Sequence, residues 1–100
     1  MIVTVFRSRL KPEAREAYDP MAAHMSELAR GMPGYLSHKV FTAEDGERVT
    51  IVEFADEESH RGWAQHPKHR AGQIQGRREF YSEYKLQVCE LKRQSEKRPA

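Results

Sequence analysis

The sequence contains no asparagine, a single tryptophan and a single cysteine among its 100 residues. The lone cysteine, Cys89, has no partner for an internal disulfide, and its place in a strand-like run predicts a small buried side chain. No apolar run approaches the roughly 20 residues of a membrane span. The opening segment lacks the basic and long apolar stretches of a secretory signal. These absences argue against a disulfide-stabilised or membrane-spanning chain, and we expect a cytoplasmic protein.

Motifs for nucleotides and metals are also missing. There is no GxGxxG fingerprint, Walker loop, HExxH motif or cysteine pair, so the sequence indicates neither a flavin or nicotinamide nor a common metal site. The net charge of +2 arises in the last nine residues, and residues 1–91 hold 13 basic and 14 acidic side chains. Because the folded part carries no basic field, we do not expect it to bind nucleic acid.

What is present is a regular alternation of element types. Residues 2–10, 35–42, 49–54 and 80–91 are rich in β-branched and aromatic side chains and predict four strands. A hairpin turn at residues 43–46 joins the second strand to the third.

Two helical regions separate the strands. The first begins at Pro12, should be kinked or divided at Pro20, and ends before Pro33. Asp56 should cap the second, which Pro67 divides from a further helical piece at residues 67–77.

The order strand, helix, strand, strand, helix, strand predicts an α+β fold of ferredoxin-like βαββαβ type. We assign it to residues 1–91, with a four-stranded antiparallel sheet and both helices on one face, and treat residues 92–100 as a basic, flexible tail. Two helices cannot cover every apolar strand residue. The apolar strand residues that remain uncovered predict a homodimer through the other sheet face. We expect this face to be formed by Phe41, Val52, Tyr84, Leu86 and Val88.

Three segments resemble the antibiotic-biosynthesis monooxygenase family: MPGYLSHKVFTAEDGERVTIVEF, Trp63 with the following HPKH, and GRREFYSEYKLQVC. The resemblance covers residues 1–91 and implies a dimeric α/β barrel built from ferredoxin-like subunits. Branches of the family oxygenate polyketide quinols, oxidise other quinols or degrade haem. The polyketide branch uses an asparagine, a tryptophan and a tyrosine, and of these only the tryptophan, Trp63, has a clear match in the chain.

The candidate catalytic residues are Trp63, His66 and His69. Trp63 could wall a flat aromatic pocket or simply pack in the core. A neutral imidazole near pH 7 could accept a phenolic proton, so His66 and His69 are the best general bases in the chain. The alternative is that these histidines cap backbone groups at a helix break. The sequence gives less support to a metal site on His66 and His69, because the i, i+4 spacing and a third ligand are missing.

Other side chains complete the expected site and its surroundings. We expect the substrate pocket to be lined by Phe6, Met21, Met25, Phe54 and Phe80. His24, His38 and His60 are expected at the surface or in packing, with His38 able to face the subunit interface. Arg7 and Arg9 could bind an acidic substrate, but we expect them to pair with Glu53 and Glu83 across the sheet.

The leading hypothesis is a cofactor-independent monooxygenase that acts on a small aromatic or quinol substrate. Such an enzyme needs a base, because a phenolate or enolate can pass an electron to oxygen without a metal. A non-enzymatic dimer that binds a small ligand or serves as a stress-related module is the alternative. A haem-binding, haem-degrading enzyme is a further alternative.

Overall fold

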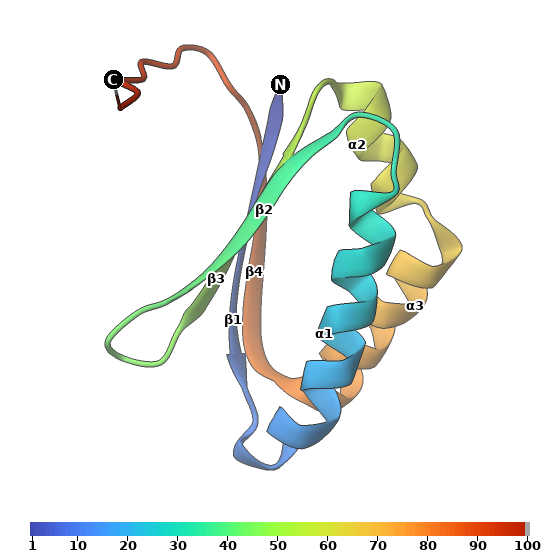
Figure 1. The fold of residues 1–100 in the computed structure, drawn as a ribbon. Coiled ribbons are helices and arrows are strands. Elements are labelled where there is room, and N and C mark those ends of the chain that lie inside the picture. Colours follow the sequence, from blue (N-terminus) through green and yellow to red (C-terminus); the bar gives the residue numbers. More distant parts are fainter. Residues whose placement is uncertain (100) are drawn as a thin grey trace.

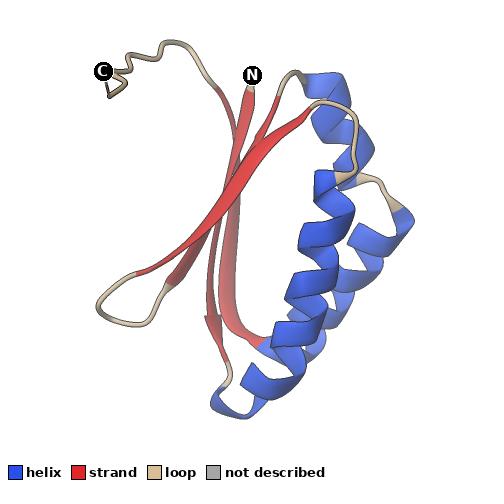
Figure 2. Cartoon of the chain, viewed as in Figure 1, coloured by secondary structure: helices blue, strands red, loops and turns tan. Residues whose placement is uncertain are grey.

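A computed structural model describes residues 1–99 of the chain, and all helices lie on one face of a single sheet (Figures 1 and 2). The predicted ferredoxin-like α+β fold is therefore confirmed. The elements in chain order are β1 (Ile2–Leu10), η1 (Pro12–Ala14), α1 (Arg15–Arg30), β2 (Tyr35–Thr42), β3 (Arg48–Phe54), α2 (Glu57–Ala64), α3 (Pro67–Gln75), η2 (Gly76–Phe80) and β4 (Tyr81–Glu90).

The sheet is antiparallel throughout and has the strand order β2-β3-β1-β4. Residues directly opposite each other on antiparallel strands point to the same side of the sheet. The side that carries Phe54 faces the helices, because Phe54 packs with Ala29 and Trp63. Besides the pair Ile2 and Phe54, three rows lie on this side. In the order β2-β3-β1-β4 they are His38-Val52-Thr4-Val88, Val40-Thr50-Phe6-Leu86 and Thr42-Arg48-Ser8-Tyr84.

This register corrects the prediction of which residues form the uncovered face. Of the five residues predicted there, only Phe41 lies on it, because the other four belong to the rows that face the helices. The uncovered face instead carries Val3, Val5, Val49, Ile51 and Phe41. Cys89 lies opposite Val3 on the same face and is exposed, so the prediction of a buried cysteine was wrong.

The helix boundaries follow local sequence signals. Pro20 lies inside α1 without dividing it; a separate 3-10 turn, η1, precedes the helix. Asp56 caps α2 as predicted, its side chain accepting a hydrogen bond from Ser59 N (2.8 Å). Pro67 occupies the first position of α3, where a missing amide hydrogen costs nothing. The predicted break between the two helical pieces is therefore confirmed.

Two clusters of buried side chains anchor the helices to the sheet. Ala14, Tyr18 and Phe80 pack where β4 begins, and Ala29, Phe54 and Trp63 pack at the opposite end of the helix layer. No helix within residues 1–99 is long and apolar enough to cross a membrane.

Arginine pairs on the uncovered face differ in part from the prediction. Arg9 pairs with Glu83 directly across the sheet (2.8 Å) and also with Asp45 (2.7 Å). Arg7 pairs with Glu47 (2.9 Å) and not with Glu53. Glu53 lies opposite Val3, four residues along β1 from Arg7, and accepts a hydrogen bond from Ser37 instead.

The end of the chain follows β4 without regular structure. Residues 91–99 belong to no helix or strand, and residues 92–99 are exposed. Leu91 N donates a hydrogen bond to the Met1 carbonyl oxygen (3.0 Å), which ties the start of this segment to β1. Ala100, the last residue of the predicted tail, lies outside the described residues.

Gly34, in the turn before β2, provides a first testable prediction. Its φ is 78°, and a Cβ there would overlap the Oγ and Cβ atoms of Ser59. Gly46 also has a positive φ (91°) but open space around it. Gly46→Ala should therefore cost about 1 kcal/mol of backbone strain, and Gly34→Ala about 2–3 kcal/mol because a steric clash adds to the strain. Urea unfolding of both variants checks this, and equal losses would contradict the steric argument.

Candidate functional site

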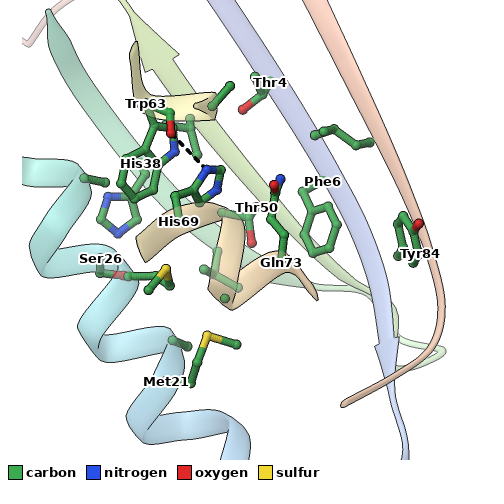
Figure 3. Close-up of a pocket in the computed structure, with 18 of the residues that line it drawn as sticks. Thr4, Phe6, Met21, Ser26, His38, Thr50, Trp63, His69, Gln73 and Tyr84 are labelled. Carbon is green, nitrogen blue, oxygen red and sulfur yellow. Dashed lines mark hydrogen bonds between the residues drawn. The ribbon is translucent and has the colours of Figure 1, made fainter. Parts of the chain in front are cut away.

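A cavity of about 300 Å³ lies between the sheet and the helices (Figure 3). Its floor is made of the three rows named above, without Thr42 and Ser8, and of Tyr81 at the start of β4. Its roof comes from one side of α1 and from α2, α3 and η2. The lining residues of these four elements are Tyr18, Met21, Ala22, Met25, Ser26, Ala29, His60, Trp63, Ala64, His69, Gly72, Gln73 and Arg77.

Trp63 and His69 form a stacked pair at this cavity. Their ring centroids are 4.0 Å apart with an interplanar angle of 22°. Trp63 is the second-last residue of α2, just before the break, whereas His69 lies in the first turn of α3. The break at Gln65 and His66 therefore turns the chain so that the two rings meet face to face.

A hydrogen bond fixes the tautomer of His69. Its Nδ1 lies 3.1 Å from the carbonyl oxygen of Trp63 (dashed in Figure 3). A carbonyl oxygen can only accept, so Nδ1 carries the hydrogen and donates it. In the neutral ring this leaves Nε2 as the nitrogen that can accept a proton. A neutral His69 can therefore act as a base only through Nε2.

Burial sets the protonation of the cavity histidines. Desolvation lowers the pKa of His69 below its ordinary value of 6.5, and the backbone carbonyls of Trp63 and Ala64 oppose this in part. The pKa values of His38 and His60 are also lowered by burial. All three imidazoles are therefore mainly neutral at pH 7.

The structure brings together some of the predicted site residues and separates others. Phe6, Met21 and Met25 line the cavity together with Trp63 and His69. Their catalytic or binding roles remain predictions.

The other three predicted residues do not line the cavity. Phe54 has 0% and Phe80 3% of its surface exposed, because each is enclosed in one of the two core clusters. His66 caps α3, its Nδ1 accepting a hydrogen bond from Lys68 N (3.1 Å). His66 therefore caps a helix, which was the alternative to its role as a base.

His38 and His60 line the cavity although the sequence suggested surface or packing positions. His38 faces the helices rather than the uncovered sheet face, since it lies opposite Val52. Its Nδ1 shares a 2.7 Å hydrogen bond with the Tyr35 hydroxyl. His60 packs edge-on against Phe54, with ring centroids 6.0 Å apart. His38 alternates with Val40 on one face of β2, and this pattern could have predicted that His38 faces the helices.

Sequence reasoning also missed Arg48, Arg77 and Tyr81, all of which line the cavity. Tyr81 follows the irregular turn η2, which has π-helical geometry, a form found often at functional sites. A Cβ on Gly76 would lie 2.5 Å from Tyr81 Cε2, so only glycine lets this ring approach so closely. Burial is the main cause that raises the pKa of Tyr81, and its phenol is protonated at pH 7. Among residues 1–99, no three His, Cys, Asp or Glu side chains are placed to hold a metal ion.

Solved structures with the same fold are numerous. A protein from Deinococcus radiodurans described as a putative antibiotic biosynthesis monooxygenase superposes with a TM-score of 0.86 at 11% identity, covering 99% of this chain and 100% of its own. Rv0793 from Mycobacterium tuberculosis gives 0.83 at 17% identity, with 95% and 98% covered. SnoaB from Streptomyces nogalater, a cofactor-independent oxygenase, gives 0.77 at 16% identity, with 93% and 94% covered. At these identities the likeness establishes the fold.

Comparison with curated protein sequences gives no match. The sequence model described as "Antibiotic biosynthesis monooxygenase" matches residues 1–75. That stretch includes β1 to β3 and the helices that carry Trp63 and His69. Because the match covers three quarters of its length, the chain belongs to the antibiotic biosynthesis monooxygenase family.

Proposed function

We propose that this protein is a monooxygenase that uses no cofactor and acts on a small planar phenol or quinol bound in the cavity. The observation that carries the proposal is the pair of Trp63 and His69: a flat aromatic wall next to a neutral imidazole of fixed tautomer. Membership of the family and the fold shared with SnoaB, a cofactor-independent oxygenase, support the same reaction class.

His69 acts as the general base in this proposal. Its Nε2 accepts the proton of a substrate hydroxyl, and its Nδ1 hydrogen bond to the Trp63 carbonyl holds the ring during the transfer. The same carbonyl stabilises the imidazolium that results. Trp63, which has 7% of its surface exposed, provides a rigid face for a planar ring.

The phenolate that forms is the reductant. It passes one electron to O₂, and the substrate radical and superoxide combine into a peroxide bonded to a ring carbon. The ring carbon loses its hydrogen as a proton, the O–O bond breaks, and the distal oxygen leaves as water. One oxygen atom remains as a carbonyl, so a phenol and O₂ give a quinone and water, with all electrons supplied by the substrate.

We further propose that two copies pair through the uncovered sheet face. This face carries Val3, Val5, Val49, Ile51 and Phe41, and Phe41 has 48% of its surface exposed. The helices lie on the opposite side of the sheet, so pairing would leave them outside (Figure 1). A second copy would remove this apolar surface from water.

Parallel measurement of binding and oxygen uptake tests the function. Trp63 is the only tryptophan, so its fluorescence reports occupancy of the cavity. We expect a simple naphthohydroquinone to quench it saturably without oxygen, and to consume oxygen above the protein-free rate of autoxidation when oxygen is admitted. Quenching with no uptake above that rate would overturn the oxygenase proposal in favour of a binding module. Uptake that appears only after haem is added would instead favour the haem alternative.

A further inference from the structure

The cavity has an uneven distribution of charge. The chain contains 15 Asp and Glu residues, and none of them lines the cavity within residues 1–99. The side chains that carry full charge there are two arginines, Arg48 of β3 and Arg77 of η2. The other side chains that line the cavity are uncharged or mainly neutral at pH 7. The only full charges at the cavity are therefore positive.

Both guanidinium groups lie against tyrosine rings. The Cζ atom of Arg48 is 5.0 Å from the ring centroid of Tyr18, and that of Arg77 is 5.2 Å from the ring centroid of Tyr84. A guanidinium above a ring uses its flat face, and the N–H donors along its edge remain available. Those donors match the two oxygens of a carboxylate.

Neither arginine is neutralised by the protein. Within the part of the chain that the structure describes, no carboxylate lies within 4.0 Å of Arg48 or Arg77. Arg7 and Arg9, on the uncovered face, each have carboxylate partners at 2.7–2.9 Å. Arg48 is half-buried, which makes an unpaired charge there more costly than one in water.

The arginines lie at the opposite end of the cavity from His69. Eight residues separate His69 from Arg77 along α3 and η2, about 12 Å at the rise of an α-helix. On the floor, the row of His38 and the row of Arg48 are four residues apart along β1, about 13 Å. The guanidinium of Arg77 lies against the ring of Tyr84. In Figure 3, Tyr84 lies across the cavity from Trp63 and His69.

From this arrangement we propose that the substrate is a hydroxylated aromatic carboxylic acid, held with its carboxylate at Arg48 and Arg77 and its reacting hydroxyl at His69. The inference rests on the proposed function, since it assigns the substrate class of the same cavity. The two ends are far enough apart for fused rings that carry the hydroxyl and the carboxylate at opposite ends. The apolar middle, formed by Phe6, Met21 and Met25, contacts the rings.

Three ligands that differ only at the acid position test the proposal. They are 6-hydroxy-2-naphthoic acid, its methyl ester and 2-naphthol, titrated calorimetrically against the full chain at pH 7.5. We expect the acid to bind about tenfold more tightly than either neutral ligand, because a charge-assisted contact is stronger than a neutral one. Arg48→Gln and Arg77→Gln should each remove most of this preference while leaving the affinity for 2-naphthol within about twofold, which also shows that the cavity is intact.

Arg70→Gln is the matched control, since Arg70 is an exposed arginine of α3 that does not line the cavity. It removes the same charge and should preserve the tenfold preference. If all three ligands bind equally to the native protein, or if the three variants behave alike, the carboxylate site is refuted while binding of a planar aromatic stands. If none of the ligands binds, both the carboxylate site and the proposed function fail.

Discussion

Replacing His69 with alanine should lower quinol-dependent oxygen uptake about a hundredfold to ten-thousandfold, the range expected when a general base is removed. His69 is the cavity histidine whose tautomer is fixed by a backbone carbonyl, through the 3.1 Å contact of Nδ1 with Trp63 O. Without it, the substrate hydroxyl must lose its proton to water, and electron transfer to oxygen slows accordingly. Initial rates from an oxygen electrode, corrected for autoxidation, measure the effect.

The pH dependence separates a base from a packing residue. Burial lowers the pKa of His69 below 6.5, and only the neutral ring can accept a proton. In the native protein kcat/KM should therefore be level near pH 7 and fall as the pH drops below 6.5 and through that lowered pKa. This acid limb should be absent from the residual activity of His69→Gln. An unchanged limb in that variant would assign it to another group.

His66→Ala is the control for His69→Ala. Both changes remove an imidazole next to the α2–α3 break, but His66 caps α3 and does not line the cavity. Its replacement should cost about 1 kcal/mol of unfolding free energy, as loss of a cap does, and leave the rate within about twofold. Comparable rate losses in the two variants, or a rate unchanged in His69→Ala, would contradict the role of His69. The Kd for the quinol without oxygen shows whether binding survives.

The strands and helices were predictable because their signals are local. Alternation of β-branched residues, Asp56 before α2 and Pro67 at the start of α3 act within a few positions. The same local signals predict that His66 caps α3, since the residue directly before a proline that begins a helix occupies the capping position. His69, three residues later, lies inside the new helix and is directed to the cavity. The proline therefore separates two histidines that look equivalent in sequence.

The two faces of the sheet could not be assigned in the same way. Alternation sorts each strand into two sets of residues, but which sets share a side depends on register between strands distant in the chain. Val52 and Val88 were therefore assigned to the wrong face, and pairing with Thr4 places them over the cavity. Arg48 and Arg77 were missed because they are 29 positions apart in sequence, and only the fold places both at the cavity.

Phe54→Ala should lower the free energy of unfolding by about 3–5 kcal/mol, the cost of removing a buried phenylalanine. Phe54 has 0% of its surface exposed and packs edge-on against Tyr35 and His60, with ring centroids 6.1 and 6.0 Å away. It also belongs to the cluster that holds Trp63. Since domains of this kind are stable by about 5–15 kcal/mol, the loss removes a large part of the total. Urea unfolding followed by Trp63 fluorescence and by circular dichroism measures it.

Phe41→Ala makes the same chemical change on the uncovered face and separates packing within one chain from packing between two. In a single chain, 48% of the Phe41 surface is exposed, so its removal should cost less than about 1 kcal/mol when the protein is dilute. If two copies pair through this face, the cost should grow with protein concentration, because association stabilises the folded state by mass action. Phe54→Ala should show its full loss already in the dilute protein. A loss for Phe41→Ala that is small and independent of concentration would overturn the proposed dimer, and a loss for Phe54→Ala below about 1 kcal/mol would contradict its position in the core.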